Sequence, residues 1–182
     1  MSGIIGVNGT KSGIIDASQS GSIFYTDSVE FTSTQETINL TTGYDISTDL
    51  VISINASVVR KCSKIWIAIS NEAFLSANIR GGDWLAYFQW EIYRTAPTTS
   101  VIASYERCGL AQDTDDITGA TGITQATISG WDKSLVYSAT GVHTYALRSA
   151  KLNNEAVYGS TGHAVHGHAG SKVNISVFGV AK

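Results

Sequence analysis

The sequence is short of charge and of proline, and each shortage narrows the class of protein. Only 15% of its 182 residues are charged, against ~25% in ordinary soluble domains. The surface is therefore expected to consist largely of Ser, Thr, Asn and Gly, and low charge is common in obligate oligomers, whose subunits hide surface from water. One proline stands against 18 glycines, so the turns are expected to use Gly, Asn and Asp.

The sequence also lacks the marks of nucleic-acid, membrane and secreted disulfide-rich proteins. Its densest basic run is Arg60-Lys61 with Lys64, and the net charge is -3, so no nucleic acid is expected as a partner. No stretch reaches the ~18 apolar residues of a membrane helix. The Gly- and Ser-rich start does not resemble a signal peptide. Two cysteines, Cys62 and Cys108, are expected to be reduced, buried thiols.

Short stretches of alternating apolar and polar residues, separated by Gly, Asn, Asp or Ser, run through most of the chain. Such spacing indicates an all-β sandwich or barrel. We find no convincing amphipathic helix, and residues 71–79 are expected to form one helical turn or a loop. Strands are predicted at residues 22–26, 36–40, 50–59, 65–69, 84–93, 101–107, 123–128, 135–138, 143–147, 156–158 and 173–180.

The segment of residues 84–93 is the richest of these predicted strands. A period of two places Trp84, Phe88, Trp90 and Ile92 on one wholly apolar face. That face is predicted to be core or a subunit interface. Tyr87, on the mixed opposite face, suits a partly wet interface, because a tyrosine ring has a polar tip.

The first 20 residues differ in composition from the remainder and contain a small duplication. Ser-Gly-Ile-Ile-Gly at residues 2–6 is echoed by Ser-Gly-Ile-Ile-Asp at residues 12–16. Isoleucines on so flexible a segment would be a liability in a free monomer. We therefore divide the chain into a docking arm, residues 1–20, and one domain, residues 21–182. The alternative is an ordinary disordered terminus. The residues expected to dock are Ile4, Ile5, Ile14 and Ile15.

Three histidines lie together in a Gly-rich stretch, which is expected to be a loop. His166 and His168 could bind a transition metal shared between subunits on a symmetry axis, and the alternative is a solvated loop. Otherwise no cofactor is expected. Cupins, which are metal-binding jelly rolls, place a Glu soon after the His-x-His pair, but Ala169 to Lys172 contain none. A cupin-like metalloprotein is thus the least favoured hypothesis.

Nothing in the sequence predicts an active site, and we expect no enzyme. There is no Gly-x-Ser-x-Gly elbow and no phosphate-binding loop. Glu91, Glu106 and Asp132 are expected to be surface carboxylates. The acidic run at residues 113–116 lacks the later calcium ligands and is expected to be a solvated turn.

Three aromatic residues near glycines are candidates for ligand binding, because rings on loops can stack on sugars or anchor protein contacts. Trp131 lies in a turn-like Ser-Gly-Trp-Asp, and the other two are Tyr44 and Tyr158. The alternative is that these rings fold onto the end of the sandwich.

Two segments near the C-terminus carry a family resemblance. Gly141-Val-His-Thr-Tyr-Ala-Leu-Arg148 resembles the penultimate strand of trimeric jelly rolls of the tumour-necrosis-factor and complement-head type. Asn174-Ile-Ser-Val-Phe-Gly-Val180 then fits the last strand. The resemblance implies a homotrimer without catalytic residues, and it places Tyr145 in the core or subunit interface.

Phage structural proteins often contain such domains, and the Ser-Gly-Ile-Ile-Gly start is similar to the N-termini of tail or virion proteins. The resemblance therefore implies a bacteriophage virion protein, anchored to other virion proteins by its arm. It would be a tail fibre or spike component, with a host surface glycan as a possible partner. The alternatives are a capsid decoration protein and, from another class, a carbohydrate-binding lectin.

Overall fold

The computed structural model describes most of the chain from Gly21 onward. The backbone is described for residues 21–31, 36–39, 45–79, 84–112, 117–138, 140–151, 157–166 and 172–182. Side chains are described for residues 21–31, 46–72, 89–105, 125, 127–138, 140–149 and 172–182. The predicted docking arm, with Ile4, Ile5, Ile14 and Ile15, lies outside these ranges, and so does Tyr44; the division into arm and domain stays a prediction.

Nearly all of the described backbone is β-strand. The elements are β1 (Ile23–Phe31), β2 (Glu36–Asn39), β3 (Asp45–Ile54), α1 (Ala56–Val59), β4 (Cys62–Ile79), β5 (Trp84–Ala96), β6 (Ser100–Gln112), β7 (Ile117–Asp132), β8 (His143–Lys151), β9 (Val157–His166) and β10 (Val173–Ala181).

The ten strands pair as one nested hairpin. β5 pairs with β6, β4 with β7, β3 with β8, β2 with β9 and β1 with β10, every pair antiparallel. The chain therefore runs out and returns along itself. Because a hairpin of ten strands would leave apolar faces in water, it folds over into two layers.

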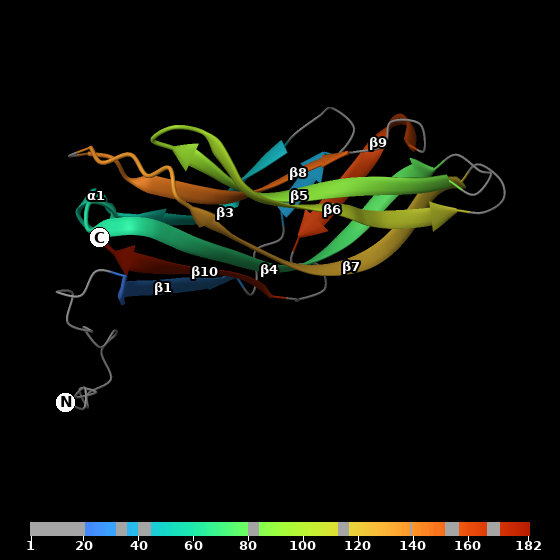
Figure 1. Ribbon diagram of the computed structural model, residues 1–182. Coiled ribbons are helices and arrows are strands. Elements are labelled where there is room, and N and C mark those ends of the chain that lie inside the picture. The colour runs from blue at the N-terminus through green and yellow to red at the C-terminus, as the bar shows by residue number, and fades with distance from the viewer. Residues whose placement is uncertain are drawn as a thin grey trace, which may run out of the picture.

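The two layers are a six-stranded and a four-stranded sheet. The first has the order β1-β10-β4-β9-β2, with β7 on the other side of β4, and the second has the order β3-β8-β5-β6. Figure 1 shows β10, β4 and β7 on one side and β3, β8, β5 and β6 on the other. A long hairpin wrapped into two antiparallel sheets is a jelly roll, so the predicted all-β jelly-roll sandwich is confirmed.

The core lies between the two sheets and is mainly aliphatic. Ile65, Ile67 and Ile69 on β4 are fully buried, as the predicted alternation requires. They face Trp90 and Ile92 on β5, which belong to the same buried cluster. Each such side chain contributes about 1.5–3 kcal/mol by leaving water.

One glycine shows how closely the sheets approach at one side. A Cβ on Gly130 of β7 would lie 2.8 Å from the carbonyl oxygen of Ile102 and 2.9 Å from the Cβ of Ala103, both on β6. Real Cβ atoms do not approach backbone so closely, and only glycine fits there. Gly130 thus lets β6 and β7 close this side of the sandwich.

The predicted strand over residues 50–59 is wrong in its second half. β3 ends at Ile54, and residues 56–59 form the single turn α1. The amide groups of Val58 and Val59 both donate to the carbonyl of Asn55. Ala56 and Val59, three residues apart, share the buried side of this turn. A helical turn therefore buries both residues as well as a strand would.

Four other local predictions also differ from the structure. Residues 71–79 are not a helical turn or loop but the second half of β4, where pairing with β7 and β9 decides the conformation. Residues 135–138 form no strand. Gly130 and Trp131 belong to β7 instead of a turn. The predicted histidine loop is partly wrong, since His163 to His166 lie in β9, which pairs with β2.

Candidate functional site

A charged cluster crosses the interior of the sandwich and joins the two sheets. Arg94 extends the inward-facing row of Trp90 and Ile92 on β5, and Asp132 lies opposite the core residue Ile65 at the end of β7. The Arg94 guanidinium donates from Nη1 to Asp132 Oδ2 at 2.5 Å, and the two side chains are 3% and 0% exposed. This ion pair therefore links the four-stranded sheet to the six-stranded sheet.

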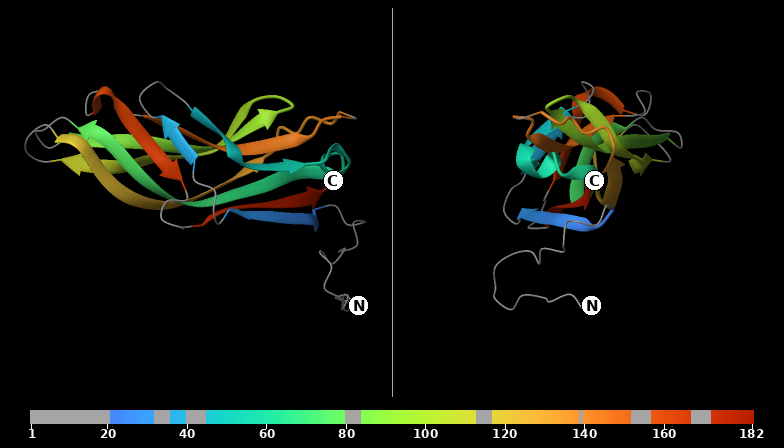
Figure 2. Two further views of the ribbon diagram at one scale, coloured as in Figure 1. Left: turned by 180° about the vertical axis from the view of Figure 1, so that it is seen from behind. Right: turned by 60° about the vertical axis from the view of Figure 1, so that its left-hand side comes forward.

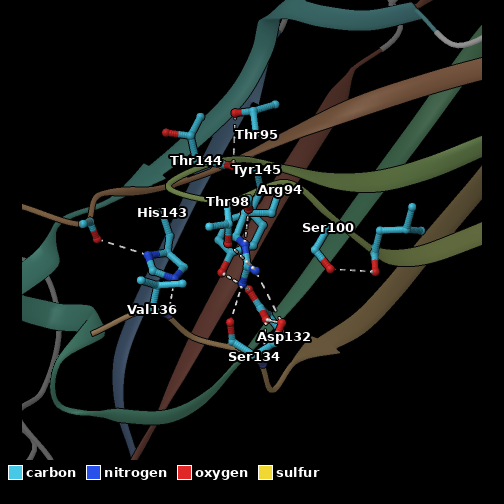
Figure 3. A network of polar contacts seen from close by, with 12 residues as sticks. Arg94, Thr95, Thr98, Ser100, Asp132, Ser134, Val136, His143, Thr144 and Tyr145 are labelled. Carbon is cyan, nitrogen blue, oxygen red and sulfur yellow. Dashed lines mark hydrogen bonds and ion pairs between the residues drawn. The ribbon is translucent and has the colours of Figure 1, made fainter. Parts of the chain in front are cut away.

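The carboxylate of Asp132 is saturated with hydrogen bonds (Figure 3). The Tyr145 hydroxyl donates to Oδ2 at 2.9 Å, while the amide and hydroxyl of Ser134 donate to Oδ1 at 3.0 and 3.1 Å. Burial, and then the charge of Asp132, raise the pKa of Tyr145, so it remains a donor. A buried carboxylate with four donors is suited to holding structure together.

Arg94 also fixes the two chain segments that cap this end of the sandwich. Its Nε donates to the Thr98 carbonyl at 2.8 Å, and its Nη1 donates to the Ser134 carbonyl at 3.0 Å. Thr98 lies in the turn between β5 and β6, and Ser134 is the second residue after the end of β7. One guanidinium thus orders both segments, which the five donors of arginine make possible.

His143 holds the rest of the segment between β7 and β8. Its Nε2 accepts from the amide of Val136 at 3.2 Å, so its Nδ1, 3.1 Å from the Gly141 carbonyl, is the donor. The ring is fully buried. Burial lowers the pKa of His143, and the positive charge of Arg94 also acts in that direction, against the Gly141 bond and Asp132. A neutral imidazole is therefore part of the folded structure.

A second ion pair lies on the other face of the four-stranded sheet. Arg148 on β8 is directly opposite Glu91 on β5 and pairs with it, with side chains 12% and 3% exposed. Gln89 donates to Glu91 at 2.7 Å, and the guanidinium of Arg148 lies 3.8 Å from the ring centre of Tyr93. Unlike the first cluster, this group lies between paired strands of one sheet, and removing either partner would leave a poorly solvated charge unpaired.

The prediction of a surface carboxylate is therefore wrong for Asp132 and for Glu91. Asp132 is 1% and Glu91 is 2% exposed, and each pairs with an arginine, the buried Arg94 and the half-buried Arg148. The side chain of Glu106 lies outside the described ones. A signal did exist for the inter-sheet pair. The apolar alternation over Trp90 and Ile92 continues to Arg94, and that over Ile128 and Gly130 continues to Asp132.

The predicted interface-or-core residues divide into two groups. Trp90, Ile92 and Tyr145 are fully buried within a single chain, so they are not available as a contact between subunits. The side chains of Trp84, Tyr87 and Phe88 lie outside the described ones, and their role stays a prediction. Cys62 is a free, buried thiol, as expected, and burial raises its pKa to about 11.

Trp131, a candidate ligand-binding residue, lies on the outer face of the six-stranded sheet. It is 41% exposed and opposite Trp66 on β4, which in turn is opposite Phe178 on β10. The rings of Trp66 and Phe178 stack with centroids 5.0 Å apart. The ammonium of Lys64 lies 4.3 Å from the ring centre of Trp131. Trp131 is therefore the exposed end of an aromatic row across three strands, in which Trp66 and Phe178 are half-buried.

The remaining site predictions fall on undescribed side chains. Tyr158 and His166 lie in β9, where only the backbone is described, and His168 lies outside the described residues. The metal site shared between subunits stays a prediction. Among the described residues no group of three or more His, Cys, Asp or Glu could hold a metal ion. Within the same ranges no helix is long and apolar enough to span a membrane.

Comparison with known proteins does not identify a family. No family model and no curated protein matches the chain. Among solved structures it is similar to the VP2 subviral particle of infectious bursal disease virus, at 15% identity and a TM-score of 0.34, covering 98% of this chain and 42% of the other. The Gx strain of that virus gives 14% identity and a TM-score of 0.31, covering 98% and 41%. The chain spans less than half the length of these proteins, and at such scores the likeness carries no argument about function.

Proposed function

We propose that this protein is a non-enzymatic structural subunit of a bacteriophage particle, a homotrimer anchored by its N-terminal arm that projects as part of a tail fibre or spike. One geometric observation carries the proposal. The arm joins an elongated sandwich at one end, so a domain held by that arm extends away from its attachment point.

The connection point is defined by the first described residues. The amide of Gly21 donates to the carbonyl of Ala181 at 3.2 Å, so the residue to which the predicted arm connects lies beside the end of β10. The C-terminus and α1 share this end of the molecule (Figure 1). We call it the arm end.

The length of the domain favours a spike that projects from the particle over a decoration protein that clamps its shell. β4 contains 18 residues, which at ~3.3 Å per residue correspond to roughly 60 Å. Figure 2 shows the long direction of the molecule from behind and, after a turn of 60° from the view of Figure 1, the same molecule foreshortened. A decoration protein that clamps a shell needs breadth against the shell. A spike needs length, and its far end would meet the host, where a surface glycan is the proposed receptor.

The surface composition favours assembly with other copies. Among the described side chains, seven that are large and apolar or aromatic are at least 38% exposed, and only 15% of the residues of the chain are charged. Exposed apolar surface on a sparsely charged protein is lowered in free energy by association, and closed threefold symmetry offers the same contact to every subunit. The exposed side chains are Ile23, Ile46, Val101, Tyr105, Trp131, Tyr137 and Val142.

Immunogold electron microscopy tests this proposal. Antibodies raised against the full chain should label intact particles of the phage that encodes it, at the tail and not over the head. Labelling spread over the head would favour the decoration protein. Absence of the chain from purified particles, measured by mass spectrometry, would overturn the proposal.

A further inference from the structure

Basic side chains from separate parts of the sequence lie together at the arm end. The amide of Lys182 donates to the carbonyl of Lys61 at 3.1 Å, next to Arg60. Lys133 directly follows Asp132, which is opposite Ile65, so the β4–β7 register brings Lys133 beside Lys64. Five of the 12 Lys and Arg residues thus meet here, although the longest run in the sequence is two.

These cations have almost no acidic neighbours. The segments that build the arm end, residues 21–26, 55–66, 94–100, 131–142 and 178–182, contain a single acidic side chain, Asp132. The next acidic side chain along β1, Asp27, accepts a hydrogen bond from the Tyr25 hydroxyl. Asp132 is buried and already neutralised by Arg94. None of the five cations forms an ion pair with a described carboxylate, whereas the more distant Lys172 pairs with Glu30 at 2.8 Å. The arm end is therefore a local positive patch on a chain of net charge -3.

Two exposed aromatic rings lie within the patch, each beside an ammonium group. Lys64 lies 4.3 Å from the ring centre of Trp131, and Lys182 lies 3.6 Å from that of Tyr137. Both rings are more than 40% exposed. Tyr137 is held in place, since its hydroxyl donates to the Cys62 carbonyl at 3.0 Å. Rigid exposed Trp and Tyr side chains are the usual anchors of protein interfaces.

We propose that the arm end is itself a docking surface for an acidic protein surface of the virus particle. The arm exit fixes which way the patch faces, because Gly21 lies at this end and an anchored arm turns this end toward the particle. Charge complementarity fixes the chemistry of the partner. The arm and the patch then act as two linked contacts, so each raises the effective concentration of the other.

Nucleic acid is the less favoured polyanion. A nucleic-acid-binding domain is usually basic as a whole, whereas this chain has a pI of 5.7. A long polyanion bound at the patch would also extend over the rest of the protein surface. That surface is negatively charged and would repel it. An acidic patch on a folded partner meets only the arm end, and there the two rings add apolar contacts to the pairing of charges.

The inference rests on the proposed function and is tested with particles produced without this protein. Purified full-length chain is mixed with them, and binding is measured by co-sedimentation as NaCl is raised. The wild-type chain should bind to the particles, and its binding should weaken as the NaCl concentration rises. A Lys64→Gln/Lys182→Gln double variant and, separately, Trp131→Ala should each bind at least tenfold more weakly.

Matched controls and competitors define the outcomes. Lys172→Gln and Tyr105→Ala change an exposed lysine and an exposed aromatic away from the patch, and each should bind within twofold of wild type. Poly-L-glutamate should compete for the chain, and stronger competition by a short single-stranded DNA would overturn the acidic-protein partner. Thermal unfolding verifies that every variant is folded.

Failure of the inference differs from failure of the proposed function. Particles that take up the double variant and Trp131→Ala as well as wild type, but not a chain lacking residues 1–20, would show that the arm alone docks. That result overturns the patch and leaves the virion role intact. A folded chain that binds no particle and is absent from natural particles overturns both.

Discussion

The two faces of the six-stranded sheet differ in which substitutions they can tolerate. Two neighbouring residues at the end of β7 show the difference. Asp132 points into the sandwich, is 1% exposed and is fixed by Arg94 and Tyr145, while Trp131 points out and is 41% exposed. The inner face combines aliphatic packing with one saturated charge cluster. The outer face has an aromatic row and an adjoining positive patch. The inner face therefore determines folding, and the outer face is free to serve recognition.

The largest expected effect is on the inner face at the ion pair. Asp132→Ala leaves Arg94 buried without its counter-charge and should lower the free energy of unfolding by about 3–5 kcal/mol. Urea denaturation followed by circular dichroism measures this loss. The double variant Arg94→Met/Asp132→Leu, which removes both charges, should recover most of it. A loss below about 1 kcal/mol for Asp132→Ala would show that the inter-sheet pair is not a clamp.

The second prediction concerns pH and His143. Because burial lowers its pKa below the ordinary value of 6.5, the unfolded chain binds more protons than the folded one as pH falls below 6.5. The stability that neutral His143 contributes is thus present above pH 6.5 and is lost on acidification, by at most about 1.4 kcal/mol per pH unit.

The matched variant for this prediction is His143→Gln. Its unfolding free energy, measured from pH 7.5 to 5, should vary less steeply with pH than that of wild type, at a lower absolute stability. Equal slopes for the two proteins would contradict the role of the neutral imidazole that accepts from Val136.

The third prediction compares the removal of one heavy atom from a side chain on each of the two faces of the sheet. Ile67 is fully buried on β4, so Ile67→Val should lower the free energy of unfolding by about 1 kcal/mol. Ser129 on the outer face is exposed, and Ser129→Ala should change it by less than about 0.5 kcal/mol. Chemical denaturation of both variants measures the contrast, which would disappear if the outer face were covered in solution.

The last prediction concerns Trp131, whose exposed ring should contribute little to stability. Trp131→Ala removes an exposed ring and one cation–π contact with Lys64, which should cost no more than about 1 kcal/mol. Thermal melting measures this change. A much larger loss of stability would show that Trp131 is needed for the fold, and would weaken its assignment to recognition.

The sequence predicts the sandwich well where one period of alternation decides burial. The alternation over Ile65 to Ile69 and that over residues 173–180 correspond to β4 and β10, with the expected side chains inside. It fails where a different backbone buries the same residues, as at Ala56 and Val59 of α1. It also fails at residues 135–138, where Tyr137 and the His143 contact to Val136 hold a non-strand segment.

The site features depend on contacts between distant parts of the chain, which no local pattern contains. The nested pairing brings Lys133 to Lys64 and Lys182 to Lys61, so a patch forms from runs too short to notice. The Arg94–Asp132 pair joins two residues that lie 38 positions apart in the sequence, on β5 and β7. Their alternation places both inside, but only the fold pairs them.

The central claim is that this sandwich works as an assembly of three chains. Sedimentation velocity of the full-length protein, at concentrations from micromolar to nanomolar, tests it most directly. The account predicts a single species with three times the mass of one chain, stable on dilution. A species with the mass of one chain at every concentration would contradict it.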